Sequence, residues 1–448
     1  MTFLVGLDVG TTSSKAVVFD QSGAEVSRGR AVTRWHTVGN RTEAEPLELV
    51  ASARQALRQA VADLPQGCVT AVGVASMGES GVLLDRGGQP IGPLIAWHDS
   101  RDEAEVAELA AEFGADQFAV RTGLPLRSQW SLTKHRWLIR HYAGAAEAVR
   151  RLGVAEYVVR SLGGDEASEL SLASRTGWLA LATRTWWPES LSWSGADPSL
   201  LPPLVSAGTA LGRASAADLP QLDGAVLTVA GHDHQAAAVG VGAIATGDEL
   251  DSCGTAEAVL RTVAPGLATE NLLALTRGGV TIGWHALADH WCLLGGTEGG
   301  LVLARTLTRL GIDRADLPAL DAEVLAGEAL AGEALKGGPS AGEIGRADRP
   351  AVIWRGALEE VTAQAHRIHC AMSAVTGPHH RFVVTGGWAH SAGLLEFKRR
   401  AFGPVQHATV PEAGALGAAL LAGVAAGVYR TVDEAVGATR TPAELGRT

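Results

Sequence analysis

The sequence is poor in cysteine, lacks long apolar runs and has no excess of basic residues, and each shortage excludes a class of protein. Four cysteines are scattered over 448 residues without a Cys-x-x-Cys pair, which argues against a disulfide framework and a structural zinc site. No stretch of about 18 uninterrupted apolar residues occurs, so neither a transmembrane helix nor a membrane partner is expected. The formal net charge of −11 offers no basic surface for a nucleic-acid partner.

The amino terminus also lacks the features of a signal peptide. It has no charged leading segment, and Asp8 interrupts its short apolar run. Together with the cysteine usage, this predicts a soluble, cytoplasmic protein. A chain of 448 residues is long enough for two large cores. A homodimer is compatible with these features, which do not fix the oligomeric state.

The most informative segment is a polar turn near the amino terminus, Gly10-Thr11-Thr12-Ser13-Ser14, between apolar runs at 3–9 and 15–19. The pattern predicts a β-hairpin, and such a turn can present N–H groups and hydroxyls to an anion. Asp8 precedes the turn and can hold a metal through water. The alternative is a turn selected only for its geometry. Gly254-Thr255 repeats the plan near mid-chain, which suggests two similar domains closing on one nucleotide.

The order of the expected elements is typical of α/β domains. Strands are predicted at 3–9, 15–19, 25–32, 69–75 and 226–230, with a helix from Pro46 and another from about 231 to 241. The second half adds an amphipathic helix over 358–375, a strand over 382–385 and a last core helix from Glu412 to about 421. We therefore expect two domains, 1–243 and 244–448. The Ala-Gly-Glu-Ala-Leu tandem in 326–335 is interpreted as a solvated or variable helical segment without chemistry.

Asp233 opens the helix that follows the strand at 226–230. It is either an N-cap or a general base facing a substrate hydroxyl, since phosphoryl transfer needs a carboxylate near the attacking oxygen. The His-Asp-His sequence at 232–234 has no third ligand or HExxH pattern, so no protein metal cage is expected. The chain has no Gly-x4-Gly-Lys-Ser/Thr motif, which excludes a P-loop NTPase.

A second group of polar and aromatic residues lies at the ends of expected strands, where ligands gather in α/β sheets. Met77-Gly78-Glu79 ends one strand, and Trp97 with Asp99 follows another. An indole can cover a sugar face while charged groups fix its hydroxyls; the alternative is a buried Trp beside a surface ion pair. The Trp-rich stretch from 127 to 224 is interpreted as a lid or substrate-side insertion with ordinary core aromatics.

Taken in order, these motifs resemble the FGGY carbohydrate kinases, part of the ATPase group that includes actin, hexokinase and the heat-shock chaperones. The resemblance covers essentially the whole chain through six motifs: GxDxGTTxxK, WxDxR, KxxWL, GxD, SxGT and an adenosine-site pair. The matched residues are Gly6, Asp8, Gly10, Thr11, Thr12, Lys15, Trp97, Asp99, Arg101, Lys134, Trp137, Leu138, Gly231, Asp233, Ser252, Gly254, Thr255, Gly386, Gly387, Ala389, Ser391, Glu412, Ala415, Gly417, Ala418 and Ala419.

The resemblance implies two ribonuclease H-like, actin-like ATPase domains of α/β class with an interdomain cleft that holds ATP and Mg²⁺. It implies that Asp8 holds the metal through water and that Asp233 is the catalytic base for a terminal sugar hydroxyl. The implied nucleotide-binding residues are Gly10, Thr11, Thr12, Ser13, Lys15, Gly254, Thr255, Gly386, Gly387, Trp388, Ser391 and Glu412. The implied acceptor site consists of Met77, Gly78, Glu79, Trp97, Asp99, Trp130, Asp233 and His234.

Three positions depart from the family pattern. Trp388 replaces the third glycine of the adenosine loop, and His135 replaces an apolar residue after Lys134. The strand end Ser-Met-Gly-Glu-Ser at 76–80 is not the Gln-Met-His-Gly of xylulose kinases. It is closer to the Arg-Glu pair of glycerol kinases but lacks the Arg, so the individual substrate is not assigned.

The leading hypothesis is an ATP-dependent kinase of a small sugar or polyol, similar to xylulose, gluconate or glycerol kinases. An actin-like or chaperone-like ATPase acting on protein partners is the alternative. A catalytically silent sugar-binding relative is a third possibility, which the retention of Asp8, Asp233 and both Gly-Thr turns disfavours.

Overall fold

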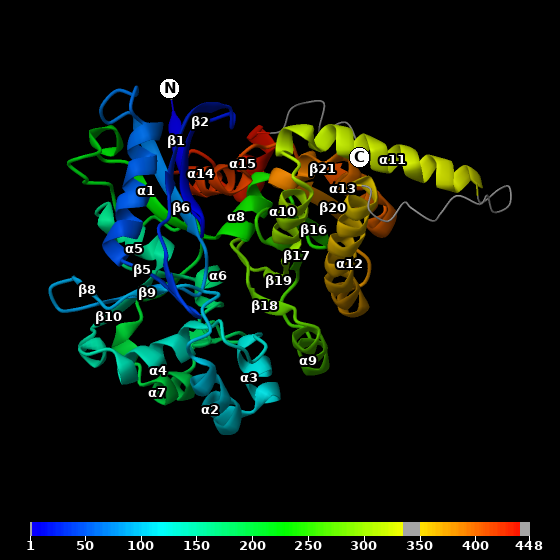
Figure 1. Ribbon diagram of the computed structural model, residues 1–448. Coiled ribbons are helices and arrows are strands. Elements are labelled where there is room, and N and C mark those ends of the chain that lie inside the picture. The colour runs from blue at the N-terminus through cyan, green and yellow to red at the C-terminus, as the bar shows by residue number, and fades with distance from the viewer. Residues whose placement is uncertain (1, 335–349, 440–448) are drawn as a thin grey trace.

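Two β-sheets organise the computed structural model, which describes residues 2–334 and 350–439 (Figure 1). The first sheet has the order β15-β6-β1-β2-β3. Its members are β1 (Phe3–Val9), β2 (Ser13–Asp20), β3 (Glu25–Val32), β6 (Val69–Ser76) and β15 (Val226–His232). Strands β1, β2 and β3 form an antiparallel meander, and β6 and β15 continue the sheet in parallel with β1.

The second sheet repeats this plan. Its order is β18-β19-β17-β16-β20-β21, with β16 (Asp248–Cys253), β17 (Glu257–Val263), β18 (Thr281–Trp284), β19 (Trp291–Thr297), β20 (Arg381–Thr385) and β21 (Val405–His407). Strands β16, β17 and β19 are antiparallel, while β20 and β21 run parallel to β16. Strands β19-β17-β16-β20-β21 therefore correspond to β3-β2-β1-β6-β15, and each half begins with a hairpin that carries a Gly-Thr turn.

The last long helix of the chain packs on the first sheet. α14 (Ala413–Ala425) lies against β1 and β6, next to α8 (Asp233–Gly240). A Cβ added at Gly6 would lie 1.7 Å from the carbonyl oxygen of Ala415, and one at Gly73 would lie 2.0 Å from that of Ala418. Only glycine permits this approach. The start of α14 is thereby brought to the end of β1, beside Asp8.

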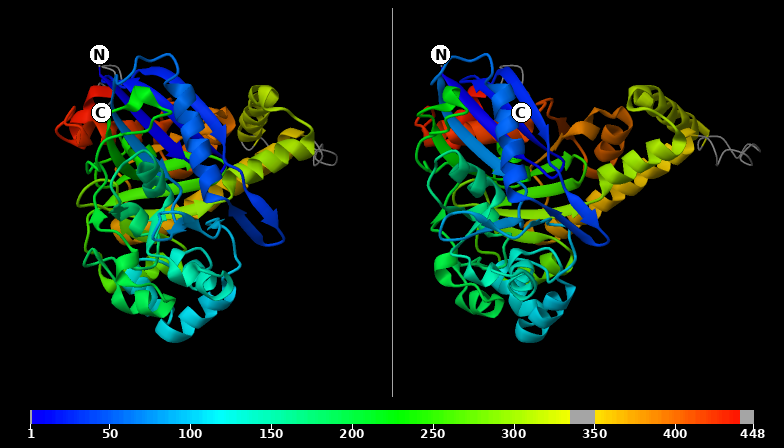
Figure 2. Two further views of the ribbon diagram at one scale, coloured as in Figure 1. Left: turned by 90° about the vertical axis from the view of Figure 1, so that its left-hand side faces the viewer. Right: turned by 60° about the vertical axis from the view of Figure 1, so that its left-hand side comes forward.

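The remaining helices cover the two sheets and build the insertion. α1 (Pro46–Ala60) covers β2 and β3. The second sheet carries α9 (Thr269–Arg277), α10 (Gly299–Leu310), α11 (Leu317–Ala334), α12 (Pro350–Thr376) and α13 (Ala392–Phe402). Figure 2 shows α11 and α12 extending away from the body. The tandem repeat expected to be helical lies in α11, except residue 335, which lies outside the described residues.

The Trp-rich insertion is a helical layer with its own core. It contains α2 (Glu103–Phe113), α3 (Ala115–Thr122), α4 (Ser131–His141) and α7 (Pro188–Ser194), which enclose Trp130, Trp178 and Trp187. These indoles are core aromatics, as expected. The layer is bonded to the edge of the second sheet, because Ile282 N donates to Gly123 O (2.8 Å) and Trp284 N donates to Ser174 Oγ (2.9 Å).

Shorter elements connect these parts. They are β4 (His36–Val38), β5 (Arg41–Ala44), β7 (Gly81–Leu84), β8 (Pro90–Ile91), β9 (Leu94–Ile95), β10 (Arg150–Gly153), β11 (Ser168–Glu169), β12 (Leu179–Ala180), β13 (Thr185–Trp186), β14 (Leu204–Val205), α5 (Val154–Ser161), α6 (Leu170–Ala173) and α15 (Val432–Thr439). Among the helices that the structure describes, not one combines the length and apolarity that crossing a membrane requires.

Candidate active site

The first Gly-Thr turn is held by two indoles. Gly10 N donates to Ser13 O (3.2 Å), which closes the turn between β1 and β2. Trp35 Nε1 donates to Thr11 O (2.7 Å), and Trp97 Nε1 donates to Thr11 Oγ1 (3.0 Å). Trp97, predicted to lie at the acceptor, is therefore bonded to the turn predicted to hold phosphate. The two predicted subsites meet at Thr11.

Asp233 follows β15, whose pairing with its neighbour is irregular near its end. The pairing of β15 with β6 shifts between Val229 and Gly231, and Gly231 has φ of 92°. A Cβ at Gly231 would lie 2.6 Å from Ser171 Oγ, and the same Oγ accepts a hydrogen bond from His232 N (2.9 Å). His232 is the N-cap residue of α8 and Asp233 is its first helical residue. Capping, the alternative role for Asp233, is not what the structure shows.

Two partly buried carboxylates, those of Asp8 and Asp233, lie close enough to interact at this point. Burial, and then the charge of Asp233, raises the pKa of Asp8 to about 7, and Asp8 Oδ1 is buried without a partner in the described part of the chain. Burial also acts to raise the pKa of Asp233, but His234 and His232 outweigh it and lower that pKa. His234 N donates to Asp233 Oδ1 (2.7 Å), and His232 Nδ1 lies 2.9 Å from that oxygen. Asp233 is thus the carboxylate that stays ionised at neutral pH.

An ion pair joins the first hairpin to the start of α14. Lys15 Nζ on β2 lies 2.9 Å from Glu412 Oε2, and both side chains are partly exposed. A Cβ at Gly414 would lie 3.1 Å from Asp8 Oδ2. The residues predicted near the amino terminus and those predicted near residue 412 therefore form one cluster.

The nucleotide-binding segments predicted in the second half are also adjacent. Gly254 N donates to Ser252 O (3.0 Å) in the turn between β16 and β17, and a Cβ at Gly300 would lie 1.9 Å from Gly254 O. Gly386 has φ of 98°, and a Cβ there would lie 2.6 Å from Cys253 O. The loop after β20 is thus packed directly on the second Gly-Thr hairpin, with Thr255 and Gly387 in the two adjoining segments.

Two members of the predicted adenosine site are buried with their own partners. Ser391 Oγ donates to Asp321 Oδ2 (2.8 Å) and accepts from Leu394 N (3.1 Å), so it caps α13. Trp388 is buried, with the guanidinium carbon of Arg314 3.9 Å from its ring centre. The indole that replaces the family glycine therefore belongs to the core of the second half.

On the acceptor side, Glu79 is held by residues that the sequence pattern did not reveal. Glu79 has φ of 64° and is buried. Arg175 places Nε 2.8 Å and NH2 2.6 Å from Glu79 Oε1, and Gln129 Nε2 donates to the same oxygen (2.9 Å). A Cβ at Gly78 would lie 3.1 Å from Arg175 Cγ. The guanidinium that the strand-end motif lacks is thus supplied by Arg175, from a distant segment that lies over Gly78.

Arg175 also reaches the second half of the chain. Its NH1 donates to Thr281 Oγ1 on β18 (2.7 Å). His234 is close enough to Arg175 and Glu79 to respond to both charges, although burial is the main cause that lowers the pKa of His234. Glu79, Arg175 and His234 therefore form one polar strip that leads to Asp233.

Three other predicted acceptor residues, Asp99, Trp130 and Met77, are buried and have partners within the protein. Asp99 is buried and accepts hydrogen bonds from Arg101, which also contacts Glu43. This is the ion-pair alternative, buried rather than at the surface. Trp130 is fully buried and donates to Pro125 O (2.7 Å). Met77 is buried too, with its sulfur 3.9 Å from Thr11 Oγ1.

Lys134 and His135 of the KxxWL element also have defined positions. Lys134 Nζ donates to Trp97 O (3.0 Å) and Gln129 O (3.3 Å), so it braces two loops of the acceptor side. His135 packs against Trp178, and burial lowers its pKa to about 3. A neutral imidazole therefore fills the place of the usual apolar side chain.

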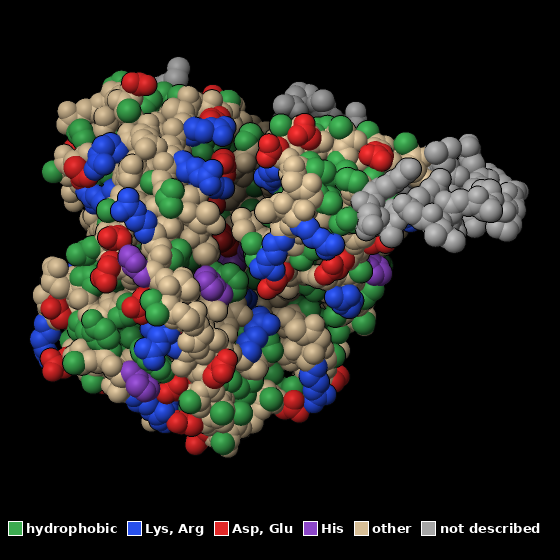
Figure 3. Space-filling model, in the orientation of Figure 1, with side chains coloured by type: hydrophobic (Ala, Val, Ile, Leu, Met, Phe, Trp, Pro, Cys, Tyr) green, Lys and Arg blue, Asp and Glu red, His purple; other side chains and the backbone are tan. Residues whose placement is uncertain are grey.

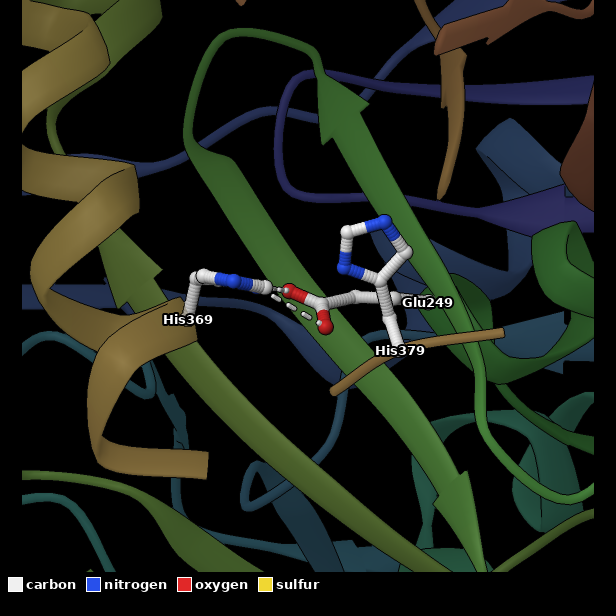
Figure 4. Close-up of side chains that lie close together, drawn as sticks. All are labelled: Glu249, His369 and His379. Atoms are coloured by element: carbon white, nitrogen blue, oxygen red, sulfur yellow. Dashed lines mark hydrogen bonds and ion pairs between the residues drawn. The ribbon is translucent and has the colours of Figure 1, made fainter. Parts of the chain in front are cut away.

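Two groups of residues in the described ranges have the spacing of metal ligands. In each group, an arginine or lysine side chain is bonded to the carboxylates. Figure 4 shows Glu249, His369 and His379, with His369 Nδ1 3.0 Å from Glu249 Oε1. Arg261 Nε donates to Glu249 Oε2 (2.7 Å). In the other group, Asp251, Cys253 and Glu257, the ammonium of Lys398 contacts both carboxylates. These clusters are organised as ion-pair networks.

Figure 3 shows the surface hollowed between the half that carries the first sheet and the half that carries the second, with charged side chains at the rim. Solved structures share this fold. The glycerol kinase of Plasmodium falciparum with ADP superposes with a TM-score of 0.85, at 18% identity, covering 98% of this chain and 93% of that chain. The predicted fold, two actin-like ATPase domains of α/β class, is confirmed.

The family follows from sequence comparison. The model of the FGGY family of carbohydrate kinases, N-terminal domain, matches residues 3–240. The glycerol kinase of Rhizorhabdus wittichii is 30% identical, covering 97% of this chain and 90% of that protein. The glycerol kinase of Leifsonia xyli is 29% identical, covering 96% and 90%. The chain belongs to the FGGY family of carbohydrate kinases. It is a sugar or polyol kinase, a phosphotransferase with an alcohol group as acceptor, in a family that uses ATP.

Proposed function

We propose that the protein transfers the γ-phosphoryl group of ATP to a hydroxyl of a small sugar or polyol, with Asp233 as the general base. The observation that carries this proposal is the opposite effect of the site on its two carboxylates: the pKa of Asp8 is raised and that of Asp233 is lowered. An ionised Asp233 can accept a hydroxyl proton as the phosphoryl group departs from ATP.

Asp8 is proposed to hold Mg²⁺ through water. Its buried, unpartnered Oδ1 fits this role, because a carboxylate oxygen left without a partner is costly unless a cation or water satisfies it. When bound, the ion would neutralise charge on the phosphates during transfer. Lys15, 2.9 Å from Glu412, would orient the phosphates from the other side of the turn.

The nucleotide would lie between the two hairpins. We propose that Gly10, Thr11, Thr12 and Ser13 on one side, and Gly254 and Thr255 on the other, offer donors to the phosphates. Gly386, Gly387 and Glu412 would border the adenosine. Trp388 and Ser391 would act through the shape of the loop, since both are buried with partners of their own.

The acceptor would lie along Glu79 and His234, with Met77, Gly78 and Trp97 forming the wall that faces Thr11. The contacts recorded for the Glu79 carboxylate within the described residues all use Oε1, so Oε2 is proposed to accept a substrate hydroxyl. Asp99 and Trp130 would hold this wall in place. Residues 1–243 and 244–448 are proposed as the two units that close on the substrates, which would exclude water.

The test is ADP release from purified protein with and without a panel of sugars and polyols. Release that depends on an acceptor supports the kinase. Release without any acceptor supports the ATPase alternative, and no release supports a silent binding protein. Location in the cytoplasm and assembly as a homodimer stay predictions from the sequence, to be tested by fractionation and by size-exclusion chromatography with light scattering.

A further inference from the structure

One arginine on the acceptor side, Arg127, has no acidic partner among the described residues. Arg127 lies in the loop before α4, with its guanidinium carbon 5.2 Å from the ring centre of Trp130. The guanidinium carbon of Arg175 lies at the same distance from that ring. Within residues 2–334 and 350–439, no carboxylate pairs with Arg127 and no hydrogen bond from its side chain is recorded, whereas Arg175 is bonded to Glu79 and Thr281.

Arg127 combines access to water with contact to a buried indole. Its side chain is exposed to solvent, yet burial, followed by the charge of Arg175, lowers its pKa to about 10, against an opposing effect of Glu79. The guanidinium lies over the ring of Trp130, which is fully buried, so this charge lies where the buried acceptor side meets solvent.

The charged side chains around Arg127 leave a positive excess. Arg175 neutralises Glu79 at 2.6 Å, and Lys134 is bonded to backbone carbonyls. The charge of Arg127 is therefore uncompensated. Arg127 and Arg175 share the ring of Trp130, each at 5.2 Å, so the polar strip that leads from Asp233 through His234 and Arg175 continues to Arg127.

We propose that the acceptor is a small polyhydroxy carboxylate whose carboxylate pairs with Arg127 while a hydroxyl at the other end faces Asp233. This rests on the proposed kinase function and names its substrate class. The planar fork of a guanidinium matches a carboxylate with two parallel hydrogen bonds. A single free arginine suits this monoanion better than a phosphate dianion, which recruits several donors.

The experiment compares each acid with the neutral polyol of the same chain: glycerate with glycerol, erythronate with erythritol, xylonate with xylitol and gluconate with glucitol. Glycerol 3-phosphate and xylulose 5-phosphate form the phosphate arm. ADP release gives kcat and KM for each acceptor. We expect one acid to exceed its matched polyol in kcat/KM by roughly 10- to 100-fold, the scale of a hydrogen bond between charged groups.

Three variants assign the preference to Arg127. Arg127→Gln should raise KM for the acid and remove most of the preference, and Arg127→Lys should retain part of it. The matched control is Arg121→Gln, which removes the same charge from an exposed arginine at the end of α3 and should keep the preference. Acid-induced thermal shift, measured without ATP on the wild type and Arg127→Gln, gives a readout that needs no turnover.

The outcomes separate the two proposals. Preference for a neutral polyol, or equal loss for acid and polyol in Arg127→Gln, overturns the acidic acceptor and leaves the kinase intact. Preference for a phosphate ester overturns the carboxylate. If no acceptor supports ADP release, the kinase proposal fails, and the thermal shift alone then decides whether acids bind at Arg127: a shift lost in Arg127→Gln supports binding, and no shift contradicts it.

Discussion

Removing the guanidinium of Arg175 should destabilise the protein because it leaves a buried carboxylate unpaired. The side chains of Arg175 and Glu79 are only 9% and 3% exposed, and their closest atoms are 2.6 Å apart. Breaking a buried pair by deleting one partner costs about 3–5 kcal/mol. In Arg175→Met, the carboxylate of Glu79 retains only Gln129 as a side-chain donor among the described residues. We therefore expect the thermal midpoint of the variant to fall clearly below that of the wild type.

A double-mutant cycle separates this cost from function. Glu79→Gln combined with Arg175→Met removes both charges, so the double variant should be more stable than the sum of the single losses predicts, by about 1–3 kcal/mol of coupling. Acceptor KM should remain raised in the double variant, because the group proposed to bind the hydroxyl is changed. Additive losses in chemical denaturation, or an Arg175→Met variant as stable as the wild type, would refute the reasoning.

Three further variants test other parts of the account. Asp8→Asn should raise the magnesium concentration needed for half-maximal ADP release by roughly tenfold or more; an unchanged magnesium titration counts against the metal role. Lys398→Met leaves the carboxylates of Asp251 and Glu257 buried without their ammonium, so a loss of about 3 kcal/mol or more is expected in urea unfolding. Burial raises the pKa of Glu169 to about 7, so its protonated form contributes stability that is complete below the unfolded-state pKa near 4.5 and is lost as the pH rises to about 7. Glu169→Gln should flatten the fall in thermal midpoint between pH 5 and pH 8, and a parallel curve would contradict this.

The parts of the site that local sequence encodes were predictable. A glycine-threonine turn between two apolar runs predicts a hairpin, because apolar alternation ends where the chain must reverse. Both hairpins are present, at β1–β2 and β16–β17. The position of Asp233 after a strand was visible in the same way. That Asp233 does not cap the helix could not be predicted, because this depends on the shifted strand pairing at Gly231.

The parts that depend on distant segments could not be read from the sequence. Arg175 lies 96 positions from Glu79, and nothing in its neighbourhood distinguishes it from a surface arginine. The packing of α14 on the first sheet depends on several glycines whose close contacts only the folded chain shows. Ser391 was a candidate for nucleotide binding, although a serine before a helix is also a common N-cap. In the structure its hydroxyl accepts from Leu394 N and caps α13.

The central claim is that Asp233 is the general base of a kinase reaction, and Asp233→Asn tests it most directly. The change keeps the size of the side chain and removes its basicity, so single-turnover phosphorylation of the best acceptor should slow by roughly 10² or more. Binding of the acceptor, measured by calorimetry, should persist in the variant. Near-normal phosphoryl transfer in a folded Asp233→Asn protein would contradict the account.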